Sequence, residues 1–85
     1  MRCRVDWQQS ALDELATIWM RADTGQRAAV TEAAQAIDRS LQDHPDRKGE
    51  SRPGGRRILF SAPLAVMFRV VPEDSLVRVL KAWRY

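Results

Sequence analysis

The chemistry that this sequence suggests is concentrated in the stretch GESRPGGRR, which begins at Gly49 and ends at Arg57. It holds the arginines Arg52, Arg56 and Arg57 and a single acid, Glu50. A guanidinium group is planar and always charged, and it can donate two parallel hydrogen bonds to a phosphate. The stretch therefore indicates an anion-binding surface on which Glu50 could act as a base. The alternative is a solvated loop in which Glu50 only pairs with Arg52.

A second group of candidates lies at the C-terminal end of the chain. If residues 76–85 form a strand, alternation places Lys81, Trp83 and Tyr85 on one face together with Val77 and Val79. The other face would carry Leu76, Arg78, Leu80, Ala82 and Arg84. Lysine and tyrosine can donate a proton, and tryptophan can stack on a nucleobase. The first face could therefore meet one nucleic-acid ligand.

Length and charge limit the possibilities. A chain of 85 residues that is 45% hydrophobic forms one domain, residues 1–85, with a single core. Residues 47–85 hold nine Arg or Lys and three Asp or Glu, whereas residues 1–46 hold five and eight. The basic C-terminal half favours a polyanionic partner, either nucleic acid or an acidic protein.

Cysteine content and hydropathy exclude several classes. Cys3 is the only cysteine, so no disulfide can form within the chain, and we expect a cytoplasmic protein. No cysteine–histidine set exists for zinc, and we expect neither a metal nor a cofactor. No apolar run is long enough to span a membrane or to serve as a signal peptide, so no membrane partner is expected.

Hydrophobic spacing predicts the elements that position these candidates. Residues 1–7 alternate as in a half-buried strand. Helical spacing follows, first from Ser10, which could cap the helix, to Ala22 and then from Val30 to Leu41, with an end expected at His44 before a proline. Three more strands are predicted over residues 58–60, 64–71 and 76–83, after a polar loop over residues 44–55.

The order of these elements predicts an α+β fold. Short links between the last three strands imply an antiparallel meander, and the helical hairpin must bury its apolar stripe on one face of the sheet. The other face remains free for function. We expect Cys3 to be buried and Trp7 and Trp19 to lie in the core, since large aromatic side chains supply much of a small core.

This arrangement resembles the RelE/ParE superfamily, the small toxins of type II toxin–antitoxin modules, which were often first described as plasmid-stabilisation proteins. The matching pieces are RCRVDW with SALDELATIW, the helix AAVTEAAQAIDRSL ending in HP, the loop GESRPGGRR and the hairpin ILFSAPLAVMFRVVPEDSLVRVLKAWRY. They cover nearly the whole chain. The resemblance implies a RelE/ParE-like fold, growth inhibition and a cognate protein antitoxin that wraps the toxin.

The resemblance leaves the mechanism open. Members named for RelE cut mRNA on the ribosome through attack of a ribose 2′-hydroxyl on the neighbouring phosphate, which requires a base, a cation and an acid. The candidate catalytic residues are then Glu50, Arg69, Lys81 and Tyr85. The candidates for binding RNA and its phosphates are Arg52, Arg56, Arg57, Arg84 and Trp83. Members named for ParE instead poison DNA gyrase, and a third possibility is a non-toxic relative that only binds.

Two positions depart from the nuclease pattern. The nucleases commonly carry an arginine where this chain has Ala65, and often a histidine where it has Arg84. Arg69 lies four residues after Ala65, roughly 13 Å further along a strand. The expectation is nevertheless an endoribonuclease acting on ribosome-bound mRNA, with gyrase binding as the alternative. The arginines are expected to gather in one concavity of a curled sheet.

Overall fold

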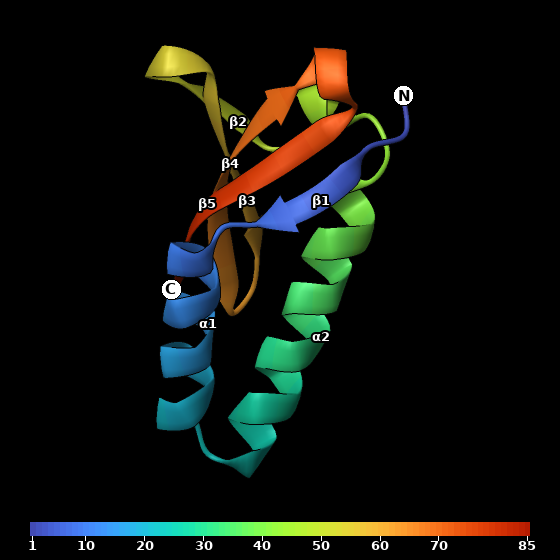
Figure 1. Ribbon diagram of the computed structural model, residues 1–85. Coiled ribbons are helices and arrows are strands. Elements are labelled where there is room, and N and C mark those ends of the chain that lie inside the picture. Colours follow the sequence, from blue (N-terminus) through green and yellow to red (C-terminus); the bar gives the residue numbers. More distant parts are fainter.

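The computed structural model describes residues 1–85 and contains a five-stranded sheet with two helices on one face (Figure 1). The helices are α1 (Gln9–Arg21) and α2 (Thr24–Leu41). The strands are β1 (Arg4–Trp7), β2 (Glu50–Arg52), β3 (Arg56–Ser61), β4 (Leu64–Val71) and β5 (Leu76–Arg84). The predicted α+β fold, with a helical hairpin followed by a meander, is confirmed.

The strands lie in the order β1-β5-β4-β3-β2. The pairs from β2 to β5 are antiparallel, whereas β1 runs parallel to β5. The last three strands therefore form the expected meander. The helical hairpin separates β1 from the rest of the sheet in sequence, which allows β1 to join the far edge in parallel.

The expectation of an unstructured loop over residues 44–55 is wrong in part. Residues Glu50–Arg52 form β2 and pair with β3. Gly49, which precedes β2, has a φ of 67°, and a Cβ at this position would collide with the backbone carbonyl of Ile58. Glycine is therefore required where the chain turns closely past β3.

The helix boundaries have clear local causes. Asp23 caps α2 because its carboxylate accepts the Gln26 backbone N–H (2.8 Å), while the Gln26 side chain accepts the Asp23 backbone N–H (3.0 Å). The N-cap of α1 is Gln8, two residues earlier than predicted, and Ser10 lies inside the helix. The prediction that Ser10 caps this helix is therefore wrong. His44, beyond α2, has a left-handed φ of 47°.

The core lies between the helices and the sheet. Its members include Cys3, as predicted, together with Val30, Ile37 and Leu41 of α2. The sheet contributes Leu64, Val66, Phe68, Val77, Val79 and Ala82. Only the small Ala11 is fully buried on α1, so this helix lies close to β5.

Trp7 packs against the core, as expected, but the prediction that Trp19 is a core residue is wrong. Trp19 is 42% exposed, and the Arg27 guanidinium lies 4.3 Å from the centre of its ring. The reason is geometric, because the tip of the helical hairpin extends past the end of the sheet (Figure 1). The sheet cannot cover the apolar stripe along its full length.

Candidate functional site

Four arginines form a row across the face of the sheet that points away from the helices. Arg52 lies opposite Arg56, Arg56 opposite Arg69, and Arg69 opposite Arg78. Residues that lie directly opposite each other on antiparallel strands share a face. The core residues Val66 and Phe68 alternate with these positions, so the row is on the open face. We call Arg52, Arg56, Arg69 and Arg78 the arginine row.

The middle of the arginine row lacks acidic partners. At its two ends, Arg52 pairs with Glu50 at 3.1 Å and Arg78 lies 3.9 Å from Asp6. Arg69 donates only to the Gly54 carbonyl (3.0 Å), and Arg56 makes no side-chain hydrogen bond or ion pair. Like charges directly opposite each other in a sheet are destabilising. The unpaired charge in the centre of the row therefore suits an anionic ligand.

Aromatic side chains lie on the same face, nearer the end of β5. Fully buried Ala65 is flanked in the sheet by Phe60 and Trp83. The Phe60 and Tyr85 rings meet edge to face, with centroids 5.3 Å apart. We call Phe60, Trp83 and Tyr85 the aromatic patch. Lys81 lies in the row of residues between this patch and the arginine row, opposite Met67.

The predicted alternation along the last strand holds from Lys81 onward but is wrong for the residues before Leu80. Phe68 pairs with Val79 but its neighbour Met67 pairs with Lys81, so Leu80 is an extra, bulged residue on β5. A bulge shifts the alternation of side chains by one residue. Val77 and Val79 therefore face the helices, on the opposite side from Lys81, Trp83 and Tyr85.

The bulge changes which residues can act together. Arg78 joins Lys81 and Trp83 on the open face, whereas Arg84, opposite buried Leu64, is on the helix side. Arg78, which strict alternation places on the other face from Lys81, was not among the predicted site residues. Phe60 was also missed, although a large apolar residue beside two arginines in a short strand was a usable signal.

Two arginines predicted to bind phosphate are separated from the row. Arg57 lies opposite Phe68 on the helix side and donates to the carbonyls of Lys48 (2.8 Å) and Gly49 (3.2 Å). It therefore holds the link before β2 in place. Arg84 lines a small cavity beside Asp13 and Glu14 of α1.

The four candidate catalytic residues share the open face but are not in one compact group. Glu50 and Lys81 lie at opposite ends of a row that crosses β2 to β5. Three strand spacings separate them, roughly 14 Å. Arg69 and Lys81 are closer, on adjacent strands, and Tyr85 lies beyond Lys81 next to Phe60.

The expected concavity around the arginines is not confirmed by any of the three cavities of the structure. Two of the three cavities lie between α1 and α2, and the third lies between α1 and the end of β5. None is lined by the arginine row, which lies on an open sheet surface. No group of three or more His, Cys, Asp or Glu side chains is placed to hold a metal ion.

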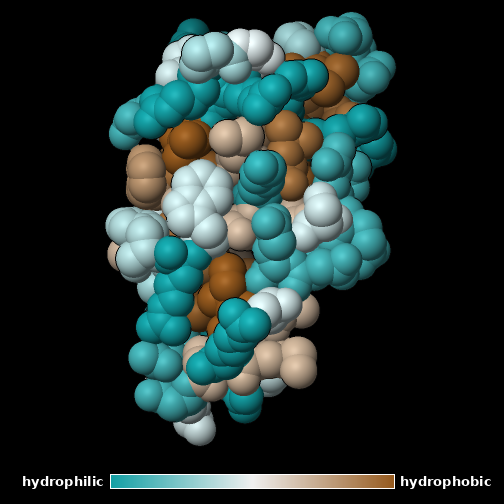
Figure 2. Space-filling model, turned by 90° about the vertical axis from the view of Figure 1, so that its left-hand side faces the viewer, coloured by the Kyte–Doolittle hydropathy of each residue, from teal (hydrophilic) through white to brown (hydrophobic).

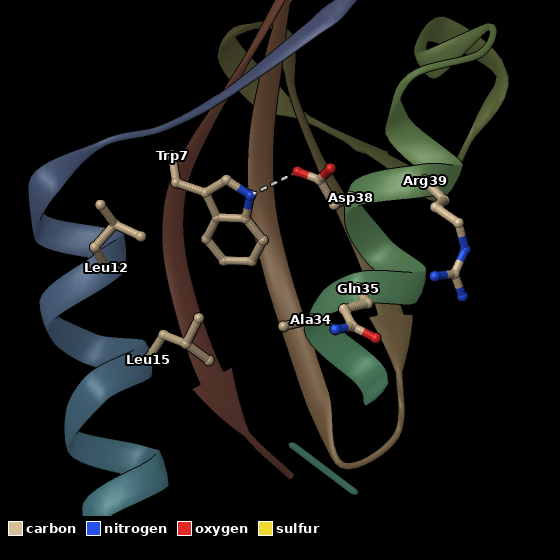
Figure 3. Close-up of a pocket in the computed structure, with 7 residues that line it drawn as sticks. All are labelled: Trp7, Leu12, Leu15, Ala34, Gln35, Asp38 and Arg39. Carbon is tan, nitrogen blue, oxygen red and sulfur yellow. Dashed lines mark hydrogen bonds between the residues drawn. The ribbon is translucent and has the colours of Figure 1, made fainter. Parts of the chain in front are cut away.

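An apolar groove runs between the two helices. It consists of two adjoining cavities of about 410 and 370 Å³ that share Leu12, Leu15, Ala34 and Gln35. Figure 3 shows Leu12 and Leu15 of α1 facing Ala34 of α2, with the Trp7 indole at one end donating to Asp38 (3.2 Å). We call this the interhelical groove.

Exposed apolar side chains are concentrated at two of these places. Leu12, Trp19 and Met20 line the interhelical groove and are 42%, 42% and 70% exposed. Phe60 and Tyr85 of the aromatic patch are 43% and 60% exposed. Figure 2 shows one side of the molecule, where apolar patches are separated by hydrophilic side chains. Separate patches of this kind indicate contact surfaces.

The fold of the chain is similar to those of solved structures of toxins and toxin–antitoxin complexes. The chain matches one from the chromosomal ParDE TA system of P. aeruginosa with a TM-score of 0.77 and 19% identity, covering 98% of this chain and 96% of that one. It matches the toxin–antitoxin complex RelBE2 of Mycobacterium tuberculosis with a TM-score of 0.71 and 20% identity, over 100% and 93% of the two chains. The chain has the RelE/ParE toxin fold.

A third RelE/ParE structure, a mutant of E. coli toxin RelE in the free state, matches with a TM-score of 0.65 and 18% identity over 99% of this chain and 84% of that one. No protein-family model and no curated protein sequence matches the chain. Neither helix of this RelE/ParE fold is long and apolar enough to cross a membrane.

Proposed function

We propose that this chain is the toxin of a type II toxin–antitoxin module and that it inhibits growth by cleaving mRNA at the ribosome. The fold that it has in common with RelE and ParE toxins supports the toxin role. The arginine row on the open sheet face supports an RNA target. Arginine is well suited to phosphates, and exposed aromatic rings beside it can stack on unpaired bases.

The open face offers a path for a single RNA strand. The arginine row crosses four strands, a span of roughly 14 Å, which is long enough to contact successive phosphates. The aromatic patch begins two rows away and would receive the bases. An open sheet face without a deep pocket is compatible with a target that is presented by a much larger particle.

Roles in cleavage follow from the chemistry of each candidate. Arg69 would stabilise the negative charge that develops on the pentavalent phosphate. Lys81 or Tyr85 would protonate the leaving oxygen, and Glu50 would take the 2′-hydroxyl proton. Because Glu50 pairs with Arg52, RNA binding must first draw Arg52 to a phosphate and release the carboxylate.

One observation favours a second candidate function, the binding of DNA gyrase without catalysis. Ala65 stands where the resembled nucleases carry an arginine, and it is fully buried between Phe60 and Trp83. The strand therefore presents no cation at that point. In this alternative, the arginine row would bind an acidic protein surface.

Induced expression distinguishes these functions. The nuclease proposal predicts growth arrest, cuts within the codons of translated messages, and loss of cutting in the variant that combines Arg69→Ala with Tyr85→Phe. Intact messages together with supercoiling defects would support the gyrase alternative instead. Normal growth at a high level of folded protein would contradict the toxin role.

We further propose that an antitoxin segment docks in the interhelical groove. The exposed apolar side chains of α1 and α2 suit the apolar face of an amphipathic helix. The product of an adjacent short acidic reading frame should restore growth, and Ala34→Glu in the groove should abolish this rescue. The control Ala28→Glu adds the same charge to an exposed position of α2 that does not line the groove, and it should be rescued normally.

A further inference from the structure

The C-terminal part of β5 has no strand neighbour on one side. The parallel partner β1 ends at Trp7, which lies opposite Val79. From Leu80 onward, this edge of β5 faces α1 instead. Backbone groups at an unpaired sheet edge need other hydrogen-bond partners or water.

Side chains of α1 supply those partners on both sides of Lys81. The Ser10 hydroxyl donates to the carbonyl of the bulged Leu80 (3.3 Å), and the Glu14 carboxylate accepts the backbone N–H of Ala82 (3.0 Å). Ser10 and Glu14 are four residues apart and so lie on the same side of the helix. The backbone N–H of Gln8 also donates to the Val79 carbonyl (2.9 Å) and continues this contact towards β1.

We propose that Ser10 and Glu14 form a clamp that fixes the Leu80 bulge and thereby directs Lys81, Trp83 and Tyr85 towards the open face. This inference rests on the proposed function, because it assigns both residues the role of positioning the RNA-binding surface. Both side chains bind backbone atoms of β5, and Glu14 also lines the cavity between α1 and the end of β5 together with Trp83. Glu14 is the stronger member, since a charged acceptor makes the stronger hydrogen bond.

The clamp acts on the one feature that determines the direction of these side chains. Without the bulge, β5 would keep its strict alternation, and Lys81 and Trp83 would turn towards the helices with Val77 and Val79. The clamped groups are backbone atoms of Leu80 and Ala82, so the side chains of Lys81 and Trp83 remain free for a ligand. The bulge is thus specified by a helix 68 residues away in sequence.

The Glu14 side chain can be tested with matched variants. Glu14→Ala removes the acceptor and retains a good helix former, Glu14→Gln keeps a carbonyl acceptor, and Asp13→Ala removes the same charge from the neighbouring position. NMR hydrogen exchange of the free protein should show the Ala82 amide exchanging about tenfold faster in Glu14→Ala. The Trp83 indole resonance should shift in the same variant, and both signals should stay near wild type in Glu14→Gln and Asp13→Ala.

Affinity for a short single-stranded RNA should follow the same pattern. We expect a loss of about tenfold in Glu14→Ala at a temperature where all variants are folded, with recovery in Glu14→Gln. If Glu14→Ala fails to fold, Ser10→Ala should give a loss of RNA affinity in its place, smaller than tenfold. An unchanged Ala82 exchange rate in folded Glu14→Ala would overturn the clamp, and so would faster exchange with an unmoved Trp83 signal.

The two proposals can fail separately. If the wild-type protein binds no RNA, the proposed function fails, and the clamp is then judged on the Ala82 and Trp83 signals alone. If the wild type binds RNA and Glu14→Ala binds it equally well despite altered NMR signals, the proposed function stands and the positioning role of Glu14 is refuted.

Discussion

Gly49 and Gly55 allow two effects to be separated at the scale of single residues. Both have a positive φ, 67° and 74°, which disfavours any side chain. Only Gly49 also lies against the backbone of Ile58, whereas a Cβ on Gly55 would meet nothing within 4 Å. The close approach at Gly49 holds β2 and the first arginine of the row against β3.

We therefore expect Gly49→Ala to lower the free energy of unfolding by roughly 3 kcal/mol and Gly55→Ala by only about 1 kcal/mol. The first value combines the cost of a left-handed alanine with the displacement of β2, and the second contains the left-handed cost alone. Urea denaturation of the two variants measures the difference. Equal losses of stability in the two variants would show that the close approach of Gly49 to Ile58 adds no cost of its own.

At the scale of elements, the start of α2 depends on a reciprocal pair of hydrogen bonds between Asp23 and Gln26. Asp23→Ala should reduce the free energy of unfolding by about 1 kcal/mol, because it leaves a helix N–H without its acceptor. Asp23→Asn should retain most of the stability. Glu32→Ala is the matched control, since it removes the same charge from the exposed surface of α2 without breaking a side-chain hydrogen bond. If Glu32→Ala lowered the free energy of unfolding as much as Asp23→Ala, the capping role of Asp23 would be contradicted.

Elements with long, regular patterns were predictable from sequence, and those that depend on distant contacts were not. The apolar spacing of α1 and α2 and the proline turns between the last strands predicted the order of the main elements. The strand β2 was missed because its residues, Glu50–Arg52, are three polar residues that pair only after β3 has formed. The Leu80 bulge was missed because its hydrogen-bond partners, Ser10 and Glu14, lie on α1.

The candidate site was predictable to the extent that strand alternation holds. Arg69 is the only charged residue of its strand, so its place on the face away from the core could be inferred from the sequence. The register that places Arg56 opposite Arg69 cannot be inferred in this way, because it depends on the turn between β3 and β4. Arg57 was also ambiguous, since its neighbour Arg56 has the same chemistry and faces the other way.

At the scale of the whole molecule, the charge of the arginine row opposes folding of the free protein. Arg56→Gln should raise the free energy of unfolding by several tenths of a kcal/mol, because it removes like-charge contacts with Arg52 and Arg69. Added sodium chloride should stabilise the wild type more than this variant by screening the same repulsion. Thermal denaturation at low and high salt measures both effects. A variant less stable than wild type at low salt would contradict this account of the row.

The most direct test of the central claim is the salt dependence of binding to a short single-stranded RNA. The variant that combines Arg56→Gln with Arg69→Gln is compared with one that combines Arg21→Gln with Arg39→Gln, which removes the same charge from the exposed surfaces of the helices. If the open face binds phosphates, the slope of log K against log salt should become shallower by about 1.4 in the first variant, since each phosphate contact contributes about 0.7. The second variant should keep the wild-type slope. Equal changes in both variants would show that binding follows total charge, and the arginine row would then not be the site.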